Sequence, residues 1–196
     1  MATDDQLRDA MAKAMEGFAA AVGAIEPHHW DRPSPCAEWS VWDVISHVVA
    51  GERFTTALLA GASLAAAVEE AKVGLKPEEP DLVGQVVDAA AVALDAFGGS
   101  LDRTVEHRVG MITARRMLGF RIIDELGHTW DVATATGQPS NLDPDALTAG
   151  VEIALAERKT LEQSSHFATL PEDGQTAFSD PLTMFLQAIG RVNPDH

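Results

Sequence analysis

Apolar residues recur every three or four positions over most of the chain, which is the spacing of helices that bury one face. The first such stretch covers residues 4–25 and ends before Pro27. The alanine-rich range 62–73 is expected to continue the second helix past Gly61. The same spacing predicts the further helices, over residues 40–59, 81–97, 113–136, 143–161 and 180–189.

Residues that favour helix ends lie at the borders of these stretches. Ser40 followed by Asp43 has the spacing of a capping box, and Asp143 before Pro144 combines a cap with a proline in the first turn. Five or six helices with almost no strand signal predict an all-α helical bundle, a single domain over residues 1–196. The segments left between helices are loops at 26–39 and 163–179, and a short hairpin or irregular connection at 100–112.

The charge of the chain excludes some classes of partner. With 30 acidic against 14 basic residues, the formal net charge is -16. We therefore expect no nucleic-acid partner and no anionic membrane partner, because such polyanions would be repelled. The N-terminus is acidic and polar, without a signal peptide, and no stretch is long and apolar enough to span a bilayer. These features predict a cytoplasmic protein.

The chain has a single cysteine, Cys36, which excludes an intramolecular disulfide and a zinc site of several thiolates. Cys36 could act as a nucleophile or a metal ligand, but a lone cysteine without a neighbouring base is more often a small buried hydrophobic residue. The motifs of nucleophile elbows, phosphate-binding loops, dinucleotide-binding turns and zincins are absent. Candidate chemistry therefore has to come from histidines and carboxylates.

Two of the seven histidines, His47 and His128, lie within apolar helical stretches. Asp43 and Asp124 each precede one of them by four residues, which places each pair on one helix face. Both histidines could be structural, with the aspartates as hydrogen-bond partners. Alternatively, His47, Asp124 and His128 hold a divalent metal, with Asp43 as a supporting residue or a helix cap. Two imidazoles and one carboxylate suit zinc, and also nickel or iron.

The four-residue spacing alone is weak support for a metal site. Composition predicts about one acidic residue four positions before a histidine, and the chain has three such pairs. The third pair, Glu162 and His166, falls in or beside a predicted loop. The position of His47 and His128 inside helices is the stronger observation, because a metal would explain polar groups in a bundle core.

Other side chains near these histidines are secondary candidates. Arg115, Arg116 and Arg121 give the fourth predicted helix a basic side, which could hold a substrate carboxylate or be solvated surface charge. Asp131 could orient His128, so Arg121 and Asp131 are candidates for a catalytic role. The tryptophans expected in the core or in a pocket wall are Trp39, Trp42 and Trp130.

Three stretches resemble one known family. The sequences PSPCAEWSVWDVISHVV (33–49) and DELGHTWDVATATGQP (124–139) are similar to two signatures of the mycothiol-dependent maleylpyruvate isomerase N-terminal domain, in the DinB-like superfamily. LQAIGRVNP (186–194) is similar to the closing helix of short, single-domain members. The resemblance implies an up-down-down-up four-helix bundle whose divalent metal is held by His47, Asp124 and His128. The isomerase has a glutamate where this chain has Asp124.

Several members of the superfamily use the metal to lower the pKa of a low-molecular-weight thiol, whose thiolate attacks an electrophile. The resemblance therefore implies a metal-dependent thiol transferase or isomerase-like enzyme, with mycothiol as cosubstrate, a small-molecule substrate and a homodimeric assembly. The isomerase has a further C-terminal domain and this chain ends at His196, so maleylpyruvate isomerisation itself is not implied. Two alternatives are a non-catalytic metal- or ligand-binding bundle and an interaction module with structural histidines.

Overall fold

Helices dominate the computed structural model, which describes residues 2–36, 38–76, 81–161 and 180–191. The predicted all-α class is confirmed, with one two-stranded hairpin among the described residues. No described helix is long and apolar enough to cross a membrane. The elements in chain order are α1 (Asp4–Gly23), the 3-10 turn η1 (Pro27–His29), α2 (Val41–Leu59), α3 (Leu64–Ala71), α4 (Leu82–Ala96), β1 (Thr104–His107), β2 (Gly110–Thr113), α5 (Ala114–Thr136), α6 (Pro144–Leu161) and α7 (Pro181–Ala188).

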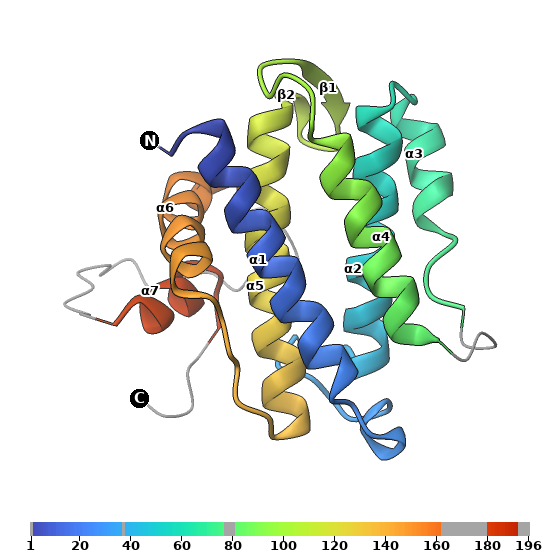
Figure 1. Ribbon diagram of the computed structural model, residues 1–196, viewed down its shortest axis with the longest axis vertical. Coiled ribbons are helices and arrows are strands. Elements are labelled where there is room, and N and C mark those ends of the chain that lie inside the picture. The colour runs from blue at the N-terminus through green and yellow to red at the C-terminus, as the bar shows by residue number, and fades with distance from the viewer. Residues whose placement is uncertain (1, 37, 77–80, 162–179, 192–196) are drawn as a thin grey trace.

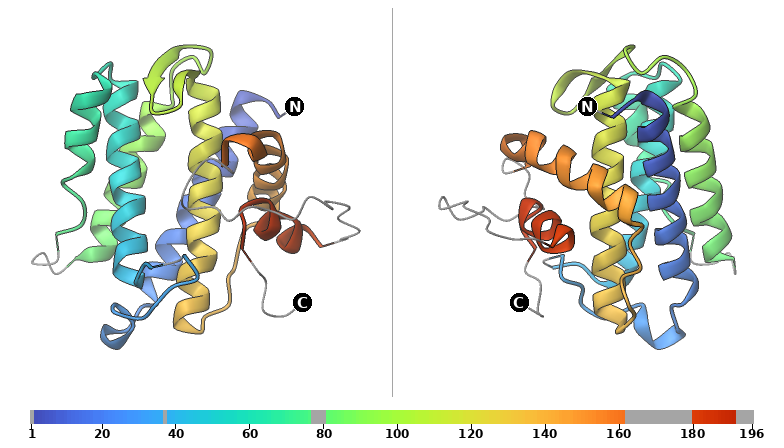
Figure 2. Two further views of the ribbon diagram at one scale, coloured as in Figure 1. Left: turned by 180° about the vertical axis from the view of Figure 1, so that it is seen from behind. Right: turned by 60° about the vertical axis from the view of Figure 1, so that its left-hand side comes forward.

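Four of these helices form a bundle (Figure 1). α1 packs against α4 and α5, and α2 packs against the same two helices. α1 and α5 run in one direction while α2 and α4 run in the other, which is the up-down-down-up order that the resemblance implies. The short α3 precedes α4 in the chain and packs on α2, so that α2 and α4 can be parallel. α6 packs against α1 and α5, and α7 packs on α6 (Figure 2).

Side-chain caps set the helix starts as the sequence predicts. Ser40 Oγ accepts the backbone N–H of Asp43 at 3.2 Å, and a carboxylate oxygen of Asp43 accepts the backbone N–H of Ser40 at 2.9 Å. At the start of α6, Asp143 accepts the backbone N–H of Ala146 at 3.0 Å. These bonds satisfy backbone donors that the first helical turn leaves unpaired. The first helix, α1, ends two residues earlier than predicted, at Gly23 and not at Ile25.

The alanine-rich range 62–73 does not continue α2, so this expectation was wrong. The backbone of Gly61 has a φ of +90°, a conformation that breaks the helix and favours glycine. Ser63 then accepts the backbone N–H of Ala66 and starts α3 as a separate helix. The predicted loop at 163–179 lies outside the described residues.

Residues 100–112 adopt the hairpin alternative. Thr104 of β1 pairs with Thr113 of β2, and His107 pairs with Gly110. This register leaves Arg108 and Val109 at the turn, close to the start of α5. The hairpin lies at one end of the bundle in Figure 1.

The most deeply buried helix, α5, also carries the largest set of buried polar side chains. It packs against α1, α2 and α6, so few of its residues face solvent. Because buried polar groups need partners, these side chains define where to look for a site. They are Arg121, Glu125, His128, Thr129, Asp131 and Thr136.

Candidate metal centre

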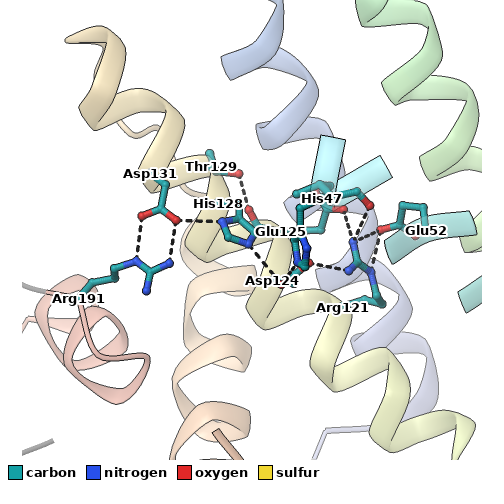
Figure 3. A network of polar contacts seen from close by, with 10 residues as sticks. His47, Glu52, Arg121, Asp124, Glu125, His128, Thr129, Asp131 and Arg191 are labelled. Atoms are coloured by element: carbon teal, nitrogen blue, oxygen red, sulfur yellow. Dashed lines mark hydrogen bonds and ion pairs between the residues drawn. The ribbon is translucent and has the colours of Figure 1, made fainter. Parts of the chain in front are cut away.

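Three potential metal ligands meet where α2 packs against α5 (Figure 3). Nε2 of His47 and Nε2 of His128 each lie 3.4 Å from Oδ1 of Asp124. One ligand atom of each residue lies within 4.8 Å of the other two, and among the described residues this is the one such group of three or more. Two bonds of about 2.1 Å at the tetrahedral angle separate ligand atoms by roughly 3.4 Å, so the spacing fits a shared ion.

The local sequence explains part of this arrangement. Asp124 and His128 share one face of α5 because they are one helical turn apart. His47 joins them from α2, and its side chain is the most accessible of the three at 35% exposed, against 17% for Asp124 and 7% for His128. The pair of Asp43 and His47 does not form, because Asp43 is exposed and bonded to Ser40 at the cap of α2. Of the two roles predicted for Asp43, supporting residue and helix cap, the structure shows the helix cap.

A buried chain of polar contacts orients His128. Nδ1 of His128 lies 2.9 Å from Oδ2 of Asp131. Arg191 donates from Nε to Asp131 Oδ1 and from Nη2 to Asp131 Oδ2, both at 2.9 Å. Because Asp131 is an acceptor, Nδ1 carries the proton and Nε2 faces Asp124, which is the orientation a metal ligand requires. Asp131 therefore lies where the sequence suggests, whereas Arg191 was missed as a partner.

A second network holds Asp124 from the other side. Arg121 donates from Nη1 to Asp124 Oδ2 at 2.6 Å. Its Nε and Nη2 donate to Oε1 of Glu52 at 2.9 and 2.6 Å, and Nη2 also donates to Oε1 of Glu125 at 3.1 Å. Sequence reasoning missed Glu52 and Glu125. An available signal was the position of Glu52 on the apolar stripe of α2, one turn after Val48.

Burial and these partners shift several pKa values. Although burial opposes ionisation of Asp124, Arg121 and the two histidines hold its pKa well below the usual range. Burial and the neighbouring Glu52 raise the pKa of Glu125 well above its usual value. Burial would lower the pKa of His128, but Asp124 and Asp131 outweigh it and raise the pKa to about 9. A metal that binds Nε2 of His128 near neutral pH must therefore displace a proton.

The remaining arginine candidates are used elsewhere. Arg115 forms an ion pair with Asp4. Arg116 donates from Nε and Nη2 to the two carboxylate oxygens of Glu157, each at 2.7 Å. Of the three arginines on this helix, Arg121 alone lines the cavity at the triad. It forms ion pairs with buried carboxylates of the protein, so it is neither a solvated surface charge nor free to hold a substrate carboxylate.

Trp39 forms a wall of the site. Its ring centroid lies 4.7 Å from that of His47 and 5.9 Å from that of His128. The preceding Glu38 has a φ of +66°, which is uncommon for a residue other than glycine and belongs to the turn that carries Trp39. The other two tryptophans do not face the triad: Trp42 packs edge-on against Trp30, and Trp130 lies in the core.

Cys36 is buried, as the sequence favours. Its side chain lies in an apolar cluster with residues of α1, α2 and α5, and burial raises the pKa of its thiol although the neighbouring Arg191 acts in the opposite direction. It is not part of the group of potential ligands. The pair of Glu162 and His166 lies outside the described residues.

A cavity of about 280 Å³ connects the triad with the hairpin. The rings of Phe54 and Phe120 line it, and the ring of His107 lies 5.5 Å and 5.8 Å from theirs. Burial, with Arg108 and Arg116 nearby, lowers the pKa of His107 to about 4, so it is neutral at pH 7.

Arg108 brings a positive charge to the hairpin end of this cavity. Its guanidinium carbon lies 4.9 Å from the ring centroid of Phe54. Within the described part of the chain, it forms no ion pair with a carboxylate, whereas the other lining arginines, Arg121 and Arg191, do. Arg108 is therefore the lining arginine that is available to an anionic ligand.

A larger hollow of about 850 Å³ lies between α2, α3 and α4. Alanines make up much of its lining, and it contains none of the triad residues. Size alone would favour this hollow as the site. We place the candidate site at the smaller cavity because that cavity holds the convergent polar groups.

Comparisons with known proteins identify related sequences and a related fold. The family model described as the mycothiol maleylpyruvate isomerase N-terminal domain matches residues 11–133, which include the whole triad. Two uncharacterized proteins from two strains of Mycobacterium tuberculosis are each 34% identical over 147 residues, covering 74% of this chain and 75% of the relative. A crystal structure of a histidine-to-alanine mutant of mycothiol-dependent maleylpyruvate isomerase has a TM-score of 0.57 at 16% identity. It covers 79% of this chain and 72% of that one, and this likeness concerns the fold.

Proposed function

Since this chain belongs to the mycothiol maleylpyruvate isomerase N-terminal domain family, we propose that it is a metal-dependent thiol transferase or isomerase-like enzyme. Its thiol cosubstrate is mycothiol, and its second substrate is a small electrophile. The observation that carries the proposal is the meeting of three potential ligands beside a cavity: His47 and His128 each lie 3.4 Å from the same oxygen of Asp124. The protein supplies no nucleophile of its own, which agrees with the buried, protonated state of Cys36.

His47, Asp124 and His128 are the residues that would hold the ion. Zinc is the first choice for two imidazoles and one carboxylate, with nickel or iron as alternatives. When bound, such an ion lowers the pKa of a coordinated thiol and so makes thiolate available near neutral pH. Three protein ligands leave a coordination position free for that thiol.

The surrounding residues have distinct tasks. Asp131 keeps the proton of His128 on Nδ1, and Arg191 keeps Asp131 ionised and in place. Trp39 covers the two histidines and limits the access of water. The aromatic wall of Phe54 and Phe120 receives the electrophile by apolar contact.

Arg108 is proposed to bind an anionic group of the electrophile. It lines the cavity without a carboxylate partner in the described part of the chain. The neutral His107 beside it adds no second positive charge. An electrophile with an apolar or unsaturated body and an acidic group would therefore extend from the triad toward the hairpin.

Metal analysis and a conjugation assay test this function together. The purified protein should hold about one divalent ion per chain and should couple mycothiol to a generic electrophile. His47→Ala and His128→Ala should lose both properties. His28→Ala is the matched control, because His28 is 59% exposed and is not in the ligand group, and it should retain both.

Each other outcome rejects a defined part of the proposal. Wild-type protein that binds no divalent ion after reconstitution contradicts the metal centre. Metal binding without conjugation of any electrophile from a broad panel contradicts the enzyme and leaves a non-catalytic metal-binding bundle.

A further inference from the structure

We propose that Arg121 is a positioning residue that makes Asp124 a ligand through one oxygen, a role that rests on the proposed metal centre. Arg121 Nη1 donates to Oδ2 of Asp124 at 2.6 Å. The other oxygen, Oδ1, lies 3.4 Å from Nε2 of both histidines. One carboxylate oxygen is thus engaged by the guanidinium, and the other is directed toward the site that the histidines share (Figure 3).

The facing helix holds Arg121 in this orientation. Glu52 Oε1 accepts from both Nε and Nη2, so that Nη1 is left to point at Asp124. The carbonyl oxygen of Val48 is 3.4 Å from Nη2 and belongs to the same turn of α2. The side chain of Arg121 is 8% exposed and that of Glu52 is 2% exposed, so water competes little for these bonds. α2 therefore contributes His47 to the centre and also fixes the third ligand through Glu52.

Gly51 of α2 provides the space that the guanidinium occupies. A Cβ atom at this position would lie 2.4 Å from Nη1 of Arg121 and 3.0 Å from its Cζ. Glycine is unfavourable inside a helix, and Gly51 lies in the middle of α2. Its absence of a side chain admits the arginine beside Asp124. Gly51 lies one helical turn after His47 on α2 and is in this way part of the same arrangement.

The arrangement has a chemical consequence for the centre. A carboxylate oxygen that accepts a charged hydrogen bond from arginine is a weaker metal donor, so the arrangement favours an ion bound through Oδ1 alone and a coordination position left free for the substrate. If Arg121 moves away, Asp124 can rotate or bind with both oxygens. Both the affinity for the ion and its coordination geometry should then change.

Gly51→Ala is the sharpest test, because it alters no ligand and no charge. The added methyl group should displace Nη1 of Arg121 from Asp124, while alanine favours the helix. We expect metal-free Gly51→Ala protein to bind Zn²⁺ about 10- to 100-fold more weakly than wild type in a competition titration with a chromophoric chelator. The visible spectrum of the Co²⁺-loaded variant should also differ from that of the wild type, which reports the coordination geometry.

Gly17→Ala is the matched control. Gly17 also lies inside a helix, and a Cβ there would meet its nearest neighbour, the Asn141 carbonyl oxygen, at an ordinary 3.9 Å. This variant should keep the wild-type affinity and the wild-type Co²⁺ spectrum. Glu52→Gln provides a second test if Gly51→Ala does not fold, because it weakens the hold on Arg121 with little change in shape, and weaker Zn²⁺ binding is again expected.

The outcomes separate this inference from the proposed function. If the wild type binds neither ion, the metal centre itself is wrong. If the wild type binds and Gly51→Ala and Glu52→Gln bind equally well or more tightly, with the same Co²⁺ spectrum, Arg121 is structural and the inference fails while the centre stands. A lower melting temperature alone, with unchanged affinity and spectrum, likewise contradicts a positioning role.

Discussion

The two ends of the cavity hold their charged side chains in opposite ways. At the triad, every buried arginine is paired: Arg121 with Glu52 and Asp124, and Arg191 with Asp131. At the hairpin, Arg108 lies over an aromatic ring and has no carboxylate partner within the described residues. The charged groups of one end are held by each other, whereas the charge of the other end is available to a ligand.

This difference fits two tasks. Buried networks of ion pairs hold side chains in one geometry, which a metal centre needs. An aromatic wall with one unpaired cation tolerates ligands of different shape, because ring contacts are less directional than ion pairs. The comparison therefore predicts that changes at the triad end affect folding and metal binding, while changes at the hairpin end affect the electrophile.

The largest effect should follow from removal of Arg191. Arg191→Met leaves Asp131 buried, with 0% of its side chain exposed and His128 as its remaining partner. Loss of one partner of such a buried pair costs about 3–5 kcal/mol. Urea unfolding of the metal-free protein measures this loss in the free energy of unfolding. Arg116→Met is the control, because the side chain of Arg116 is 36% exposed, and its loss should cost less than about 1 kcal/mol. Equal losses in the two variants would contradict the comparison.

A smaller effect is expected when Asp131 keeps its shape but loses its charge. Asp131→Asn should weaken Zn²⁺ binding about tenfold, because the amide holds the Nδ1 proton of His128 less strongly than a carboxylate does. The KM for the electrophile should stay unchanged. Asp43→Asn is the control at an exposed aspartate, and its metal affinity should equal that of the wild type. The same competition titration serves both variants, and an unaffected Asp131→Asn would show that His128 needs no such partner.

A change at the hairpin end should affect binding of the electrophile and not binding of the metal. Arg108→Met should raise the KM for an anionic electrophile by roughly tenfold, because it removes one hydrogen bond to a charged group at a partly exposed site. It should leave metal affinity unchanged, since Arg108 lies over Phe54 and is not in the group of potential ligands. A neutral electrophile provides the internal control in the same steady-state assay. An equal rise of KM for both electrophiles would show that Arg108 shapes the cavity and does not recognise charge.

The smallest effect concerns His107 and pH. The fold lowers its pKa from 6.5 to about 4, so the unfolded chain takes up a proton at a higher pH than the folded protein. The stability that neutral His107 contributes is present above pH 6.5 and is lost as the pH falls toward 4. NMR titration of the imidazole should find a midpoint well below 6.5. Unfolding of His107→Gln at pH 7 and pH 5 should show a smaller loss of stability on acidification than wild type, and an equal loss would contradict the neutral state.

Most of the fold was predictable from local patterns. The capping pair of Ser40 and Asp43 and the proline after Asp143 act within one helical turn, so the spacing of neighbouring residues is enough to predict them. The separate helix α3 was missed because its border depends on the positive φ of Gly61, and a glycine inside a helical pattern is also compatible with a continuous helix. The single domain, the homodimer and the cytoplasmic location stay predictions.

The candidate site was predictable to the extent that it lies on one helix. Asp124, His128 and Asp131 share α5, so their spacing alone places them together. Arg121 reaches Glu52 across 69 positions and Arg191 reaches Asp131 across 60, and no local period links residues so far apart. These contacts depend on how α2 and the segment after α7 pack against α5.

Interactions between residues a few positions apart account for most of the helices, for their caps and for the candidate ligands on α5. The packing of the helices against one another decides which polar residues meet. It separated Asp43 from His47, joined His47 to Asp124, and placed Arg121 in the space that Gly51 leaves. The physical reason is burial: a charged side chain inside a bundle is stable only beside its partners, and those partners come from helices that lie far apart in the chain.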